Sequence, residues 1–99
     1  MNNNIHLETV KKSGWALEHV KDQTEDICLA AVKQNGYALM YVKNQTEQIC
    51  MEAVKEDRRA LQYVKDQTEA ICLAAAKKST HSIEFIKDPV LREKIRGML

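Results

Sequence analysis

Three cysteines and one histidine return at the same position of a 22-residue pattern: His6, Cys28, Cys50 and Cys72. Thiolate and imidazole groups bind zinc, and two thiols can form a disulfide. Zinc needs its sulfur ligands about 2.3 Å from one centre, whereas equivalent positions in stacked helices lie about 8–10 Å apart. That distance also exceeds the Cα separation of about 7 Å that a disulfide tolerates. Because each cysteine directly follows an isoleucine in an apolar stripe, we expect three core residues and no metal or other cofactor.

Two columns of lysines repeat with the same spacing. They are Lys11, Lys33, Lys55 and Lys77, and Lys21, Lys43, Lys65 and Lys87. Such ladders are able to follow phosphates, and residues 77–99 add a basic end with six basic and three acidic side chains. However, we expect both columns in the last turn of a helix, where cations interact favourably with the helix dipole. Nucleic acid is therefore the disfavoured partner.

A polar trio, Gln23-Thr24-Glu25, returns unchanged at residues 45–47 and 67–69. An active site is normally single, so three copies indicate capping and hydrogen bonds between helices. His6, His19 and His81 have no serine, cysteine or aspartate at a spacing that suggests a catalytic triad. We therefore predict that the protein is not an enzyme.

These columns belong to an internal duplication. Residues 8–29 and 30–51 are identical at 12 of 22 positions, and residues 30–51 and 52–73 at 13. The chain is interpreted as one domain, residues 1–99. It contains repeats at 8–29, 30–51, 52–73 and 74–88 and a capping helix at 89–98.

Each repeat has two predicted helix starts. The N-cap columns are Asp22, Asn44, Asp66 and Asp88, and Ser13, Asn35, Asp57 and Ser79. A glutamate three residues after the first three aspartate or asparagine caps suggests a capping box. The segments between caps predict helices of about 12 and 8 residues. No repeat can bury its apolar stripe alone, so stacking predicts an all-α fold, an α-solenoid, with a closed helical bundle as the alternative.

The segment Asn35–Met51, N-G-Y-A-L-M-Y-V-K-N-Q-T-E-Q-I-C-M, resembles a helical repeat family catalogued only as a domain of unknown function. Its members read roughly N-G-x-A-L-x-Y-V-K-x-Q-T-E-x-I-C-L-A-A-V-K and occur in bacteria, phages and giant viruses. The resemblance covers residues 8–87 and departs at Arg58, where the family glycine is missing, and after Pro89. It implies a small mobile-element or effector protein and assigns no functional residue.

Positions whose residues differ between the copies are not fixed by the fold, so their side chains are better candidates for contacts with a partner. One column reads Trp15, Tyr37, Arg59 and His81, and another, three residues on, reads Glu18, Met40, Gln62 and Glu84. Tryptophan, tyrosine, methionine and arginine are enriched at protein interfaces. We interpret seven residues as partner-binding: Trp15, Glu18, Tyr37, Met40, Arg59, Gln62 and His81. The alternative is that Trp15 and Tyr37 only cover neighbouring helices. A third column, His19, Tyr41, Tyr63 and Phe85, is expected to be half-buried packing.

The bulk properties agree with a binding module. The net charge is +1, the cysteine count is odd, and neither a leader at Met1–Asn4 nor a membrane-spanning segment is recognisable. We expect reduced thiols and a cytoplasmic location in a bacterial host cell. We also expect a non-enzymatic module that binds another protein, with self-association left open. By analogy with the resemblance, it would inhibit a host defence complex, as an anti-CRISPR-type protein does. A nucleic-acid binder is the alternative.

Overall fold

The computed structural model describes residues 3–99, and the side chains from residue 5 onward; Met1 and Asn2, where we expected no leader segment, lie outside the described residues. In this part, α-helices and 3-10 helices alternate. The α-helices are α1 (Asn3–Lys12), α2 (Glu25–Gln34), α3 (Glu47–Glu56), α4 (Glu69–Lys78) and α5 (Pro89–Met98). The 3-10 helices are η1 (Gly14–His19), η2 (Gly36–Tyr41), η3 (Arg58–Tyr63) and η4 (Thr80–Phe85).

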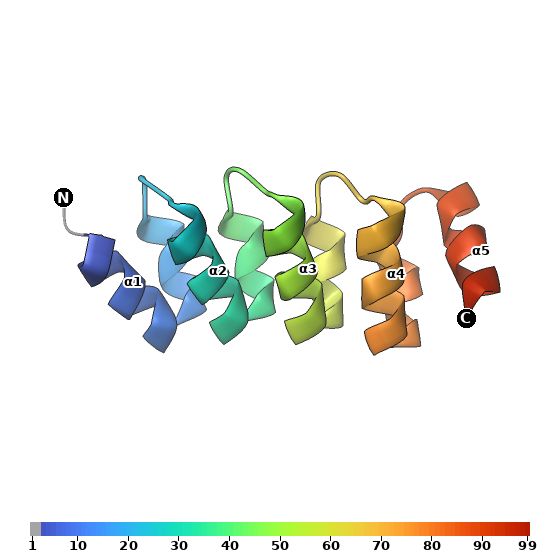
Figure 1. The fold of residues 1–99 in the computed structure, drawn as a ribbon, viewed down its shortest axis with the longest axis horizontal. Helices are drawn as coiled ribbons and strands as arrows, with labels where there is room; N and C mark the ends of the chain where they lie inside the picture. Colours follow the sequence, from blue (N-terminus) through green and yellow to red (C-terminus); the bar gives the residue numbers. More distant parts are fainter. Residues whose placement is uncertain (1–2) are drawn as a thin grey trace.

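The helices form two layers (Figure 1). The α-helices lie side by side in the front layer, and the 3-10 helices lie behind them. Within residues 3–99, each α-helix packs on the α-helices of the adjacent repeats and on none further away. The molecule is elongated, 47 × 19 × 16 Å. The predicted all-α solenoid is confirmed, and the closed bundle is excluded by this open stacking.

The short helices are 3-10 helices of six residues, not the α-helices of about eight residues that we expected. In η2, for example, the N–H of Val42 donates to the carbonyl of Leu39 at 3.0 Å. Two turns are too few to stabilise an α-helix, and 3-10 geometry is common in such short pieces. With three residues per turn, Leu39 and Val42 lie on one side, and both are buried. Asn35 caps η2 as predicted, and its side chain accepts from the N–H of Tyr37 at 3.0 Å.

The helices α2, α3 and α4 begin two residues later than predicted, whereas α5 begins where predicted. The N-caps are Thr24, Thr46 and Thr68, not Asp22, Asn44 and Asp66, and Asp88 alone in that column is an N-cap. Thr46 Oγ1, for example, accepts from the N–H of Ile49 at 3.2 Å. The predicted capping boxes are therefore wrong, because each glutamate is the first helical residue.

The core runs along the whole solenoid between the two layers. Each central α-helix buries the same four positions, for example Ile49, Cys50, Ala53 and Val54 in α3. Gly36 lets η2 approach α3 closely, since a Cβ there would lie 2.5 Å from the carbonyl oxygen of Ala53. Arg58 takes the place of this glycine in η3, and η3 accordingly packs less extensively on α4 than η2 does on α3.

The last helix, α5, covers the end of the core with Leu91 and Ile95, which pack against it. Val90 and Met98 on the same helix are exposed. Arg92 folds back and donates two hydrogen bonds to the carbonyl of Ile86, at 2.8 and 3.1 Å. Among the described helices, none combines the length and the apolar content needed to cross a bilayer.

Candidate functional site

The residues predicted to bind a partner lie on the layer of 3-10 helices. We call this surface the η face; it consists of Trp15, Glu18, Tyr37, Met40, Arg59, Gln62 and His81. In a 3-10 helix, residues i and i+3 lie directly above one another. Tyr37 and Met40 therefore share one side of η2. Arg59 and Gln62 share the same side of η3, where Gln62 Nε2 donates to the carbonyl of Arg59 at 3.0 Å.

Five of these seven residues are exposed, and Tyr37 and Gln62 are half-buried. Two large apolar side chains stand out because they remain open to solvent: Trp15 is 43% exposed and Met40 44%. The two residues come from adjacent repeats, which pack η1 against η2. The η face therefore presents apolar area that the fold itself does not cover.

An aromatic cluster holds the middle of the η face. Trp15 meets Tyr37 edge-on at 5.8 Å between ring centroids and Tyr41 at 5.9 Å, and Tyr37 meets Tyr63 at 5.1 Å. A side-chain hydrogen bond with Tyr37 raises the pKa of Tyr63, and burial raises it to a lesser degree. Trp15 and Tyr37 thus do cover neighbouring helices, as the alternative interpretation held, while Trp15 stays partly open. Rigid rings held by edge-on contacts lose little entropy when a partner binds them.

The third column behaves mostly as predicted. Tyr41, Tyr63 and Phe85 are half-buried and pack against the core, but His19 is exposed. Tyr41 and Tyr63 also border the η face through their rings, and the sequence reasoning missed this role. The signal that was available is an offset of one repeat plus four residues, which separates Trp15 from Tyr41 and Tyr37 from Tyr63.

Arg59 closes the cluster on one side. Its guanidinium lies 5.0 Å from the centre of the Tyr37 ring, a cation–π distance. The same group binds both carboxylate oxygens of Asp57, at 3.1 and 2.8 Å. This hydrogen bonding lowers the pKa of Asp57. Asp57 therefore fixes Arg59 in place, and the η face carries an oriented cation beside its aromatic rings.

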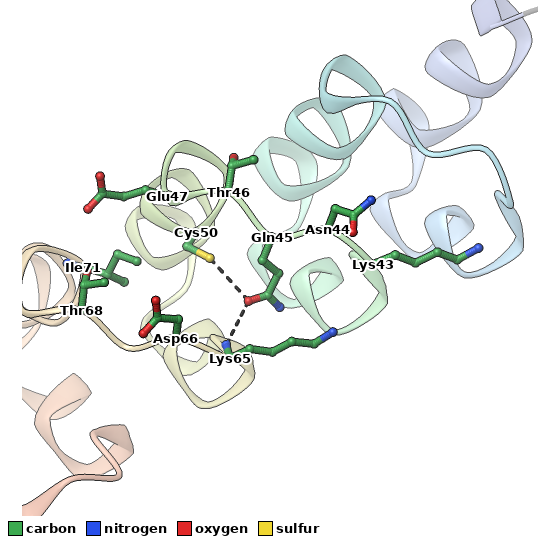
Figure 2. Close-up of a pocket in the computed structure, with 10 residues that line it drawn as sticks. All are labelled: Lys43, Asn44, Gln45, Thr46, Glu47, Cys50, Lys65, Asp66, Thr68 and Ile71. Carbon is green, nitrogen blue, oxygen red and sulfur yellow. Dashed lines mark hydrogen bonds between the residues drawn. The ribbon is translucent and has the colours of Figure 1, made fainter.

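The glutamines of the polar trio link adjacent repeats (Figure 2). Gln45 Oε1 accepts from the N–H of Lys65 at 2.9 Å and from the Cys50 thiol at 3.6 Å. Gln45 Nε2 donates to the carbonyl of Tyr63 at 2.8 Å. Gln23 and Gln67 make the same pair of backbone bonds to the next repeat. The structural role predicted for the trio is confirmed.

A cleft of 310 Å³ opens beside Gln45, between the loops that precede α3 and α4. Cys50 is its only lining residue of a strongly nucleophilic type. Burial raises the pKa of Cys50 to about 11, and the reactive form of cysteine is the thiolate. Cys50 is therefore not an activated nucleophile in this cleft.

The two lysine columns differ in position. Lys11, Lys33, Lys55 and Lys77 lie in the last turn of an α-helix, as predicted. The prediction for Lys21, Lys43, Lys65 and Lys87 is wrong, because the 3-10 helices end before them. These residues lie in the following loops, and the N–H groups of Lys43, Lys65 and Lys87 donate to the Gln23 column of the preceding repeat. Lys43 Nζ donates to the carbonyl of Lys21 at 3.0 Å.

The core role predicted for Cys28, Cys50 and Cys72 is confirmed, since all three are buried and unpaired. Burial raises the pKa of Cys28, and it raises that of Cys72 to about 11. His6, in the same column, is half-buried. Over residues 3–99, no three side chains of the histidine, cysteine, aspartate or glutamate type come together as metal ligands would.

Comparison with known proteins gives a family model described as a domain of unknown function. It matches the chain twice, over residues 2–46 and 24–69. The two matches start 22 residues apart, at residues 2 and 24, which is one repeat. No curated protein and no solved structure matches the chain.

Proposed function

The chain belongs to the DUF4116 family, a domain of unknown function, and we propose that it is a non-enzymatic module that binds another protein on the η face. The observation that carries this proposal is the pair of exposed apolar side chains, Trp15 and Met40, beside the fixed ring of Tyr37. Tryptophan, tyrosine and arginine dominate the binding energy of protein interfaces. Stacked repeats extend such a surface along the molecule.

The charges of the η face favour a protein over a nucleic acid. Binding to a phosphate backbone requires several cations that replace counterions. The η face combines Arg59 with Glu18, and the Arg59 guanidinium is already paired with Asp57. A protein partner that offers an apolar side chain to Trp15 and Met40 fits this mixed surface better. The more specific form of the proposal, an inhibitor that blocks a host defence complex, would use the same face.

The experiment compares immobilised wild type with Trp15→Ala/Met40→Ala in lysate from the organism that carries the gene. Proteins retained by the wild type should be lost by this variant. Val90→Ala is the matched control, because Val90 is 77% exposed and lies on α5, outside the η face. With a purified partner, the double variant should bind about tenfold more weakly or worse, a loss of about 1.4 kcal/mol.

Trp15 also packs on Tyr37 and Tyr41, so the fold of the variant needs its own check. Met40→Glu changes only an exposed position and should abolish retention with an unchanged circular dichroism spectrum. Equal retention of every protein by wild type, Met40→Glu and Trp15→Ala/Met40→Ala would refute the η face as the binding surface. If the retained partner is instead a nucleic acid, salt should release it, and replacing the lysines should weaken its binding.

A further inference from the structure

The outer surface of the α-helix layer is divided into three lanes that run along the solenoid. We call this surface, formed by α1 to α4, the α face. Its N-terminal lane contains the exposed carboxylates of the first helical turns: Glu25, Asp26, Glu47 and Glu69. Its C-terminal lane contains exposed residues of the last turns, six lysines and one glutamate: Lys11, Lys12, Lys33, Lys55, Glu56, Lys77 and Lys78.

An apolar lane lies between the two charged lanes. It consists of half-buried side chains that return every 22 residues: Leu7, Leu29, Met51 and Leu73. Leu7 and Leu29, with Ala30, line a hollow of 480 Å³ between α1 and α2. Glu52 is half-buried at the neighbouring position of α3. The α face is thus acidic along one border from α2 to α4 and basic along the other border. Its middle is apolar except for Glu52 and the equivalent Glu8 of α1, which is exposed.

We propose that the α faces of two copies of this chain pair about a two-fold axis parallel to the long axis of the solenoid. Such a rotation places the α face of the second copy against that of the first, with its acidic and basic borders in reversed order. The acidic lane of each copy then lies against the basic lane of the other, and the apolar lanes meet. A two-fold axis across the long axis would instead place like charges together. Only one of the two symmetric arrangements is therefore complementary.

The same symmetry fixes the register. A rotation about an axis parallel to the solenoid leaves positions along that axis unchanged, so each α-helix meets its own copy. The two copies of α2 run antiparallel, which opposes their dipoles favourably and places Asp26 against Lys33. In α3 the corresponding pair is Glu47 with Lys55, whereas α1 has no acidic residue in its first turn and Glu69 of α4 already pairs with Lys94. The proposed contact closes after two copies, and its charge pairs lie on α2 and α3.

The size of the α face suits a dimer. The face is spanned by the two longer dimensions of the molecule, 47 and 19 Å. The projection of the whole molecule has an area on the order of 900 Å², and α1 to α4 take the larger part of it, which is comparable to the roughly 800 Å² that each partner buries in a standard interface. Because the apolar lane is half-buried within the monomer, charge pairs carry much of the contact. The dimer should therefore weaken as salt rises.

The test uses charge reversal at α2 and α3, because Glu69 of α4 already pairs with Lys94 at 2.8 Å. One variant, Lys33→Glu/Lys55→Glu, makes both borders acidic there. The other, Asp26→Lys/Glu47→Lys, leaves Glu25 as the one acidic residue in the first turns of α2 and α3. Sedimentation velocity at low salt should show a monomer–dimer equilibrium for the wild type. Each variant alone should self-associate about tenfold more weakly or worse, and an equimolar mixture of the two should regain the dimer.

Lys65→Glu/Lys87→Glu carries the same change of charge outside the α face and should keep the wild-type dimer. Circular dichroism shows whether each variant folds. The proposal fails if the wild type stays monomeric at low salt. Binding of an added oligonucleotide by its lysines would not alter that conclusion. The proposal also fails if the mixed variants stay monomeric, or if the dimer survives both reversals. The η faces point away from the proposed contact, so these outcomes are independent of the proposed function.

Discussion

The side-chain amide of Gln45 donates a 2.8 Å hydrogen bond to the carbonyl oxygen of Tyr63, which is 18 residues further along the chain. This bond joins the loop before α3 to the end of η3 in the next repeat. The same side chain accepts from the N–H of Lys65, so one residue satisfies two backbone groups of its neighbour. The repeats are therefore linked by polar side chains as well as by their apolar core.

Replacing Gln45 with leucine should lower the free energy of unfolding by about 1–2 kcal/mol. The carbonyl of Tyr63 and the N–H of Lys65 would both lose their partner. Gln48→Leu is the control, because Gln48 is exposed on α3, and it should shift stability by less than about 0.5 kcal/mol. Urea unfolding followed by circular dichroism measures both. Equal stability of the two variants would show that the glutamine link contributes nothing.

Thr46 and Asn44 compete for the role of N-cap of α3, and the structure assigns it to Thr46. Thr46→Ala should therefore cost about 1 kcal/mol, the usual loss for a removed N-cap. Asn44→Ala should change stability by less than about 0.5 kcal/mol. Thermal and urea unfolding of the two variants decide between the residues. The reverse order of effects would restore the capping box that the sequence suggested.

The difference between Asn44 and Thr46 shows where sequence reasoning ends. The 22-residue period predicted the alternation of helices and the buried columns, because apolar spacing is a local pattern. The residue before the N-cap, Gln45, is held by its bond to Tyr63 in the next repeat, and a local pattern does not contain that contact. The spacing of Leu39 and Val42 fits both α and 3-10 geometry. The pairing of Trp15 with Tyr41 likewise depends on how adjacent repeats are offset.

Gly36 and Gly97 should respond in opposite ways to alanine. A Cβ at Gly36 would lie 2.5 Å from the carbonyl oxygen of Ala53, whereas a Cβ at Gly97 has nothing within 4 Å. Gly36→Ala should push η2 away from α3 and cost about 1–3 kcal/mol. Gly97→Ala lies in α5 and should leave stability unchanged or raise it by up to about 1 kcal/mol. Similar values for both variants in urea unfolding would contradict the close approach at Gly36.

The cysteine core should make stability depend on pH in the alkaline range. Burial raises the pKa of the Cys50 thiol from 9.0 to about 11, so the folded chain holds this proton more tightly than the unfolded chain. The resulting stability is fully present below pH 9.0 and is lost as the pH rises through about 11. The free energy of unfolding of the wild type should therefore fall more steeply over this range than that of Cys50→Ala.

Near pH 7 that variant should be about 1 kcal/mol less stable, through lost apolar contact. Cys50→Ala/Cys72→Ala should flatten the pH dependence further, because burial also raises the pKa of Cys72 to about 11. Urea unfolding at stepwise pH provides the measurement, and parallel curves for all three proteins would rule out the thiols as the source of the pH dependence.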